Sequence, residues 1–593
     1  MMSDPRCIDS AFTPVCSTPT ETKDPKFGHT IHIENVRSEN PDLENTPTKQ
    51  FTQHQERRHI KGHRLFFAFW GWVITEFMGG LGGNMLSPAL PVVASQFNGL
   101  SKLGWVSGAY YMTQCACMLL FGQALALFNG KYVLISAIVF FMIGSAVSGA
   151  AHNIETLIIG RAIAGIGAAG CWVSVQTTVA ELVDLESRPL VLGLFGIQNA
   201  VSGTCGPIMA GALTSRGQWR WCFLLVLPLG VVSIILNLLV IPSLPPWPIA
   251  EEIESKLDKK LESWTKHSWK GKSILLKRAI LVDFTGYFLV TSALVCFILA
   301  VQWGGDAYAW DSSVVVGLFV GFLAITATWL FWERITTWPL VMPRIFLDRT
   351  VAGATMMAML NLMCNLFAAT YLPVLYEAGR GVTPLKAGIL VIPFLMSVVV
   401  SQALQGFMMT WTKHCWTWGL VAPAFLAIGG GLLFTVDGDA KSSTIIGYQI
   451  IYGIGVGLVQ NVPYIAVQAD SAPEEVSSKI ATVSFGQLFG GLCGPVIGGA
   501  ILDSELTTRL AASGVSDAVA SAVKSSVDAV WELKEGQLRD KVIAAYIASL
   551  DRIFIASVPV ALLIIIAGAC IRNVRLNEGV RRSDTRRRSQ AQL

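Results

Sequence analysis

Residues 157–170 read LIIGRAIAGIGAAG and residues 203–213 read GTCGPIMAGAL, and the core of each stretch returns once further along the chain. The Gly-Ile-Gly triplet at 165–167 recurs at 453–455, and the Cys-Gly-Pro triplet at 205–207 recurs at 493–495. The offset is 288 residues in both cases (453 minus 165, and 493 minus 205). One such pair could arise by chance, but two pairs at one offset indicate an internal duplication.

Apolar residues dominate the chain around these repeats. Of the 593 residues, 52 % are apolar and only 14 % are charged, whereas about 25 % are charged in an ordinary soluble protein. The mean hydropathy is +0.53. This composition excludes a secreted disulfide scaffold, a disordered protein and a soluble nucleic-acid binder, because so few charges cannot keep so many apolar residues in water. It predicts an all-α polytopic membrane protein, since helices satisfy their own backbone hydrogen bonds within a bilayer.

Fourteen apolar segments of about 20 residues or more are long enough to cross a hydrocarbon core of about 30 Å. They lie near 65–90, 104–128, 132–151, 157–180, 190–213, 221–241, 281–303, 313–332, 352–376, 386–408, 416–436, 444–468, 481–502 and 553–573. The repeated triplets fall on spans four and five and on spans twelve and thirteen. The chain is therefore expected to form two six-helix bundles with two intervening helices, an architecture typical of transporters with a binding site between the halves.

The polar segments complete the expected organisation. Lysine and arginine residues are concentrated in the loops on the side of the two termini, so the positive-inside rule places both termini in the cytoplasm. The plasma membrane is the expected location, with the vacuolar membrane as the alternative. The expected regions are a disordered cytoplasmic tail (1–64), a first bundle (65–241), a cytoplasmic amphipathic linker (242–280), two extra spans (281–332), a second bundle (352–573) with an outer loop (503–552), and a basic cytoplasmic tail (574–593).

Between about residues 65 and 575 the chain resembles the major facilitator superfamily, and in particular the fourteen-span drug:proton antiporters of fungi, which include mycotoxin efflux pumps. The resemblance is carried by Arg161, Gly165, Gly167 and Gly170 in span four, and by the antiporter motif Gly203, Gly206, Pro207 and Gly211 in span five. It implies the major facilitator fold and multidrug or secondary-metabolite export. The chain departs from the family at two positions, because Gly82 and Ala126 stand where the family often carries aspartates.

Two charged residues within spans are the candidates for proton coupling, since a charge at mid-bilayer costs at least about 2.5–3.5 kcal/mol. Glu76 lies eleven residues into span one, about 16 Å deep, unless the span begins nearer residue 75 and leaves Glu76 at the surface. Arg161 cannot lose its proton, so it should face a wet cavity or a carboxylate. The family resemblance ties Arg161 to proton coupling; the alternative is a structural arginine that reaches toward the membrane surface.

Uncharged polar side chains inside the spans are candidates for the substrate cavity. A cavity with scattered amides and many aromatic residues suits a bulky amphipathic molecule, although about half of these amides should serve interhelical hydrogen bonds instead. The candidates are Asn84, Gln114, Gln176, Gln198, Asn199, Asn361, Asn365, Gln402, Gln405, Gln460, Asn461 and Gln487.

The expected function is secondary active efflux of a toxin, secondary metabolite or drug, by proton antiport and alternating access. The expected partners are a small-molecule substrate, protons and the lipid bilayer, with no nucleic acid, no metal and no cofactor, and the chain is expected to be a monomer. An intramembrane enzyme is disfavoured because no span pairs a histidine with a carboxylate, and the absence of a Walker-A loop disfavours ATP-driven transport. Two alternatives stay open: proton-coupled uptake, for instance of an iron-siderophore complex, and a non-transporting membrane sensor.

Overall fold

The computed structural model describes residues 60–86, 96–97, 103–243, 278, 282–304, 308–336, 339–341, 347–436, 440–472, 475–525, 529–533, 536–573 and 576. All of these belong to one unit, Gln55–Leu593. Most of the expected cytoplasmic tail, nearly all of the amphipathic linker and most of the basic C-terminal tail lie outside the described residues.

The described residues are almost entirely helical, which confirms the expected all-α architecture. The helices are α2 (His63–Asn84), α4 (Leu103–Leu127), α5 (Gly130–Gly149), α6 (Ile154–Leu182), α7 (Arg188–Thr214), α8 (Trp221–Leu224), α9 (Val226–Val240), α12 (Phe284–Trp303), α13 (Ser313–Ile335), α15 (Arg349–Arg380), α16 (Pro384–Thr412), α17 (Trp416–Phe434), α18 (Ser442–Val459), α19 (Val462–Asp470), α20 (Val476–Ala512), α21 (Asp517–Ser525), α22 (Ala529–Glu532) and α23 (Gln537–Cys570).

Twelve helical segments in the described part are long and apolar enough to cross a membrane. Two of these segments are continuous pairs, α8 with α9 and α18 with α19. Helices α4 and α7 lie at the two remaining expected positions and are of similar length, but they carry more polar residues, such as Gln114 and Gln198. The described helices therefore occupy all fourteen expected positions.

Short polar side chains fix where several of these helices begin. Asn153 accepts a hydrogen bond from the Thr156 amide at 2.7 Å at the start of α6, and Asp283 accepts one from the Gly286 amide at 2.8 Å at the start of α12. Such N-caps satisfy backbone donors that the first turn leaves unpaired. They set the residue at which each of these helices begins.

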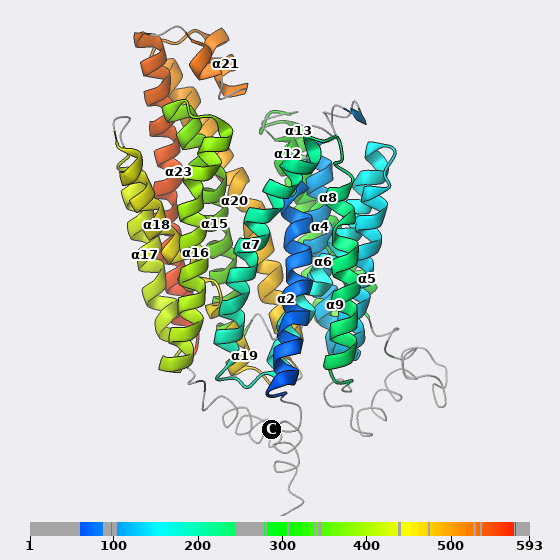
Figure 1. Cartoon of the computed structure of the whole chain (residues 1–593). Coiled ribbons are helices and arrows are strands. Elements are labelled where there is room, and N and C mark those ends of the chain that lie inside the picture. Colours follow the sequence, from blue (N-terminus) through cyan, green and yellow to red (C-terminus); the bar gives the residue numbers. More distant parts are fainter. Residues whose placement is uncertain are drawn as a thin grey trace, which may run out of the picture. The chain divides into compact units, whose positions relative to one another are not determined.

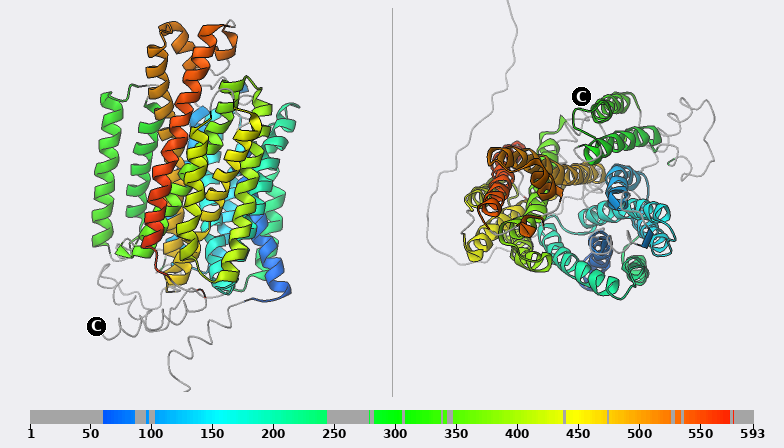
Figure 2. Two further views of the ribbon diagram at one scale, coloured as in Figure 1. Left: turned by 90° about the vertical axis from the view of Figure 1, so that its left-hand side faces the viewer. Right: turned by 90° about the horizontal axis from the view of Figure 1, so that it is seen from above.

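The helices form two bundles with a pair of helices beside them (Figure 1). In the first bundle α6 packs against α4 and α5, and α2 packs against α7 and α9. In the second bundle α15 packs against α20 and α23, while α17 packs against α18 and α23. The bundles meet where α7 contacts α16 and α4 contacts α20, and α12 lies next to α4 with α13 outside it (Figure 2). We call the side on which α2 begins the near face and the opposite side the far face.

The repeated Gly-Ile-Gly triplets do the same packing in each bundle. A Cβ atom at Gly165 would overlap the backbone of α4 at Tyr110, and one at Gly453 would come within 2.8 Å of the α16 carbonyl of Phe394. Two residues further on, the second glycine of each triplet lies against the backbone of the third helix of its own bundle, α5 or α17. Each triplet therefore holds three helices at backbone contact, as small residues do within membranes.

The segment 503–552, expected as an outer loop, is largely helical. Helix α20 has 37 residues, about 55 Å, so it extends well beyond a hydrocarbon core of about 30 Å. At the far face, Trp531 of α22 donates a hydrogen bond of 2.9 Å to the carbonyl of Glu377 at the end of α15, and Lys524 pairs with Asp503 at 2.8 Å. The Trp531 contact fixes the extension onto the second bundle, and the Lys524–Asp503 pair links α21 to α20 within the extension.

Candidate functional site

A cavity of about 180 Å³ lies within the first bundle. Four helices contribute to it, α2, α4, α6 and α7, and its walls combine one carboxyl group, three amides and three large aromatic rings. The lining residues are Thr75, Glu76, Gly79, Gly80, Gly83, Asn84, Tyr110, Tyr111, Gln114, Ala168, Cys171, Trp172 and Asn199.

Glycines on α2 leave the space for this cavity. A Cβ atom at Gly79 would have no neighbour within 4 Å, and one at Gly83 would meet only the Tyr111 hydroxyl at 3.7 Å. The opposite wall is formed by Tyr110, Tyr111 and Trp172. A larger side chain at position 79 or 83 would therefore occupy the cavity itself and leave the helix packing intact.

Glu76 is the carboxyl group of the cavity. Helix α2 begins at His63, so Glu76 is in its second half and not at its start. Its side chain is 8 % exposed, and its Oε1 atom has no hydrogen-bond partner among the described residues. The structure thus places Glu76 in one cavity with three other candidate residues, Asn84, Gln114 and Asn199.

Arg161 is buried behind the cavity wall, with 1 % of its surface exposed. One guanidinium nitrogen donates a hydrogen bond of 2.9 Å to the carbonyl of Gly82, and the guanidinium carbon lies 4.0 Å from the centre of the Tyr110 ring. Its Nε and Nη2 atoms have no hydrogen-bond partner in the described part of the chain, and no described carboxylate forms an ion pair with it. Sequence reasoning expected a wet cavity or a carboxylate; the structure instead offers a carbonyl and an aromatic face.

Steric crowding explains why position 82 carries a glycine. A Cβ atom there would lie 2.7 Å from Cζ of Phe141 on α5, too close for any side chain unless Phe141 moves. The aspartate that the family often carries at this point would therefore fit only if the Phe141 ring shifted. Arg161 takes the backbone carbonyl of the same residue as its acceptor.

Only part of the antiporter motif on α7 packs closely against another helix. A Cβ atom at Gly206 would lie 3.0 Å from Cβ of Asn84, so α7 approaches α2 closely there. Gly203 and Gly211 have no atom within 4 Å of their Cβ positions. Pro207 lies inside the helix, where it removes one backbone hydrogen bond.

The other candidate amides lie away from this cavity. Asn361 donates to Gln460 at 2.9 Å and Gln402 donates to Asn461 at 3.2 Å, which are hydrogen bonds within the second bundle. Gln487 accepts from Tyr464 at 2.7 Å. Of the remaining candidates, Gln176 and Gln198 are buried in the first bundle, Gln405 is buried on α16, and Asn365 is half-buried on α15; none of them lines the cavity.

The two bundles are in contact at the near face and diverge toward the far face. Gly193 and Gly211 are 18 residues apart on α7, about five helical turns, so they lie on the same side of the helix. A Cβ atom at Gly193 would lie 3.1 Å from the Cα atom of Gly406 on α16. A Cβ atom at Gly211 would have no neighbour within 4 Å. At the near face Lys413 also pairs with Glu186 at 2.6 Å across the bundles.

Sequence reasoning missed the aromatic wall of the site. Tyr110, Tyr111 and Trp172 sit in apolar spans where aromatic residues are common, so no pattern separates them from core residues. These three rings matter because the glycines of α2 lie opposite them in the folded chain. The sequence alone does not show that the two sets of residues face each other. The described residues also contain no group of three or more metal-ligating side chains.

Two bundles of membrane-length helices built on a repeated motif, with a polar cavity in the first bundle, define a membrane transporter of the two-bundle class. The family model of the Major Facilitator Superfamily matches residues 72–347. An MFS-type efflux pump, MFS1 of Trichophyton rubrum, is 33 % identical over 430 residues, covering 72 % of this chain and 76 % of that protein. The efflux pump aflT of Aspergillus parasiticus is 30 % identical over 431 residues, covering 72 % of this chain and 80 % of that protein. The chain belongs to the major facilitator superfamily, as the sequence motifs suggested.

Solved structures share the fold. The human organic anion transporter MFSD10 (TETRAN) aligns with a TM-score of 0.54 at 12 % identity, covering 86 % of this chain and 100 % of that one. A double-tryptophan mutant of XylE aligns with a TM-score of 0.54 at 13 % identity, covering 87 % of this chain and 98 % of that one. At these identities the likeness concerns the fold alone.

Proposed function

We propose that this chain is a secondary active efflux transporter that exports a bulky amphipathic small molecule by proton antiport and alternating access. The observation that carries the proposal is the cavity in which Glu76 is the carboxyl group and has an oxygen without a partner among the described residues. The names of the relatives from Trichophyton and Aspergillus, which are efflux pumps, support the direction.

Glu76 is suited to carry the proton. An ionised carboxylate that is buried without a cation or enough donors is costly, and a bound proton removes that cost. The titratable and charged groups around the cavity are Tyr110 and Tyr111 on α4, Cys171 on α6 and, behind Tyr110, Arg161. None of them forms an ion pair with Glu76 in the described structure, so protonation, or a donor on the cargo, is what can compensate its charge.

The lining indicates the kind of cargo. Three aromatic rings offer apolar contact, while Asn84, Gln114 and Asn199 offer donors and acceptors that can orient a polar group. This combination suits a molecule with a ring system and several hydrogen-bonding groups. A cavity of about 180 Å³ holds one part of such a molecule.

The closed near face and the divergent far face fit one state of an alternating-access cycle. We assign the near face to the cytoplasm, because the basic residues of the sequence concentrate in the loops on that side, and we place both termini there. The plasma membrane and a monomeric state complete the proposal.

Filling the cavity tests this function. In proteoliposomes with an imposed pH gradient, the native protein is expected to transport fluorescent amphipathic probes such as rhodamine 6G against their gradient. Gly79→Leu should reduce transport at least tenfold, because the new side chain occupies the cavity. Gly317→Leu on α13 is the matched control, since that glycine also has no neighbour within 4 Å but lies outside the cavity. Probe movement in the opposite direction would refute export, and equal loss in both variants would refute the site.

A further inference from the structure

The cavity is connected to the second bundle through Trp172. This residue lines the cavity from α6, and its indole nitrogen donates a hydrogen bond of 3.4 Å to the hydroxyl of Tyr464 on α19. The two rings meet edge to face, with centroids 6.4 Å apart. Among the described residues of the cavity wall, Trp172 is the one whose side chain forms a hydrogen bond to the second bundle.

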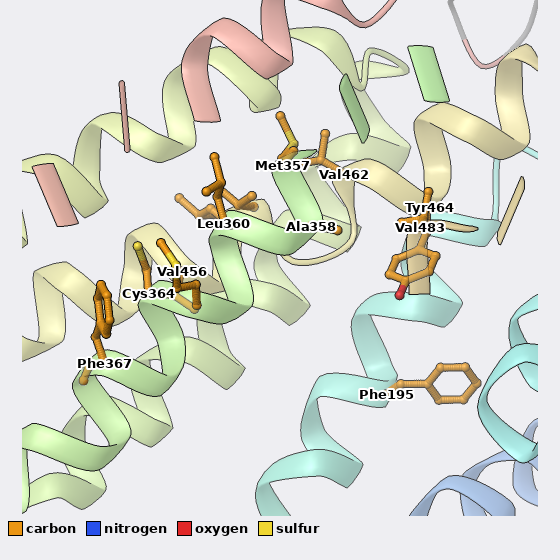
Figure 3. Close-up of a cluster of buried hydrophobic side chains, with 14 of the residues drawn as sticks. Phe195, Met357, Ala358, Leu360, Cys364, Phe367, Val456, Val462, Tyr464 and Val483 are labelled. Atoms are coloured by element: carbon orange, nitrogen blue, oxygen red, sulfur yellow. The ribbon is translucent and has the colours of Figure 1, made fainter. Parts of the chain in front are cut away.

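Tyr464 is held firmly by its own bundle. Its hydroxyl donates to Gln487 at 2.7 Å and lies 3.2 Å from the Ser484 hydroxyl, both on α20, and its side chain is 1 % exposed. In Figure 3 its ring extends from α19 toward the helices of the first bundle, to which the labelled Phe195 belongs. Because the indole N–H can only donate, the Trp172 bond uses an acceptor position of the hydroxyl that the bond to Gln487 leaves free.

The contact lies between the cavity and the near face. Trp172 is ten residues before Leu182, the end of α6, which is about 15 Å along the helix from the near face. The contacts of α7 with α16 at Gly193 and of Lys413 with Glu186 lie on the same side of the cavity. The Trp172–Tyr464 pair therefore crosses between the bundles on the near-face side of the cavity.

We propose that Trp172 and Tyr464 form the inner gate of the transport path, closing the cavity toward the near face and separating when that face opens. The inference rests on the proposed alternating access. When the bundles part, Tyr464 keeps Gln487 and Ser484, and the freed indole N–H faces a polar cavity. Loss of one such hydrogen bond should change the population of the closed face about two- to tenfold.

Cysteine crosslinking at the near face tests the gate without cargo or proton gradient. Cysteines replace Gly196 on α7 and Gln402 on α16, because a Cβ atom at Gly196 would lie 3.2 Å from Cγ of Gln402, the position that a cysteine sulfur takes. A protease site inserted between residues 244 and 277 separates the bundles unless the disulfide joins them. Tyr464→Phe and Trp172→Phe each keep a ring and lose the hydrogen bond, so both are expected to slow crosslinking about two- to tenfold. Two variants on opposite bundles keep the test usable if one fails to fold.

Tyr546→Phe is the matched control, because it also removes a buried hydroxyl, but one that donates to Val523 within the second bundle. It should crosslink at the parent rate. Native crosslinking rates in Tyr464→Phe and Trp172→Phe, at unchanged melting temperature, would overturn the gate, as would a parent pair that does not crosslink at all. A protein that crosslinks as expected but moves no probe would refute the proposed function and leave the gate standing.

Discussion

The guanidinium of Arg161 donates a hydrogen bond of 2.9 Å to the backbone carbonyl of Gly82, six residues beyond Glu76 on the same helix. This bond joins α6, which carries Trp172, to α2, which carries Glu76. The permanent charge of Arg161 is further stabilised by the face of Tyr110, which itself lines the cavity. Arg161 therefore positions three of the four helices around the proposed proton site.

Substitution of Arg161 should stop transport. Arg161→Ala removes both the bond to Gly82 and the stacking on Tyr110, and Arg161→Lys keeps the charge but loses the planar group that does both at once. We expect no detectable export for alanine and at least a tenfold loss for lysine. Cell survival under a toxic substrate, with surface protein measured alongside, is the readout. Full resistance of Arg161→Ala at normal abundance would show that the arginine is dispensable.

Glu76→Gln should abolish the dependence of transport on a proton gradient. The amide has the size of the protonated carboxyl group but cannot release a proton. Glu333→Gln is a useful control, because Glu333 is also buried but lies outside the cavity and accepts hydrogen bonds from Trp329 at 2.7 Å and the Val341 amide at 3.2 Å. Flux at several imposed pH gradients should be flat in the first variant only. A native pH response in Glu76→Gln would place the proton site elsewhere.

Gly82→Asp, which restores the residue common in the family, should destabilise this chain. The new Cβ atom would lie 2.7 Å from Phe141, and overpacking of this kind costs about 1–3 kcal/mol. The melting temperature in detergent should fall accordingly. Adding Phe141→Leu should recover part of the loss, because it clears the space and lets the aspartate approach Arg161. A single variant that melts at the native temperature would contradict this steric explanation.

The ion pair between Glu186 and Lys413 should matter less than the inner gate. Both side chains are substantially exposed, 46 % and 39 %, and exposed pairs contribute about 0–1 kcal/mol. Glu186→Gln should therefore slow near-face crosslinking at most about fivefold, and high salt should produce the same change in the double-cysteine parent. A larger effect, or one insensitive to salt, would mean that Glu186 acts by another route.

Lys413→Gly separates the ion pair from the backbone at the same position. Lys413 ends α16 with a φ angle of 57°, and among the described non-glycine residues it alone has a positive φ. Glycine removes the side chain but relieves a backbone penalty of about 1 kcal/mol. The variant should lose the salt dependence of crosslinking and melt no lower than the native protein. A lower melting temperature would show that the lysine side chain stabilises the fold itself.

The sequence predicts the fold well, because the lengths of the apolar segments and the repeated glycine triplets can be read directly from it. The same reasoning finds Glu76 and Arg161, since a charge in an apolar span stands out. It does not find the acceptor of Arg161, because a backbone carbonyl leaves no mark in the sequence. It also does not predict the crowding of position 82 by the Phe141 ring. Within 503–552 the helical spacing of Val519, Val523 and Val530 predicts a helix, but the polar composition hides how far α20 and α23 extend beyond their apolar segments.

The glycines of the cavity and the glycines of the repeat differ in how freely they can change during evolution. At Gly165 a single methyl group would collide with the backbone of α4, so a substitution there disrupts the fold and is removed by selection. At Gly79 a methyl group meets nothing, so a duplicated gene can acquire larger side chains there one at a time and keep a folded protein at every step. Selectivity for new cargo is therefore expected to diversify along this face of α2 in descendants of the gene, while the triplets that hold the helices together stay unchanged.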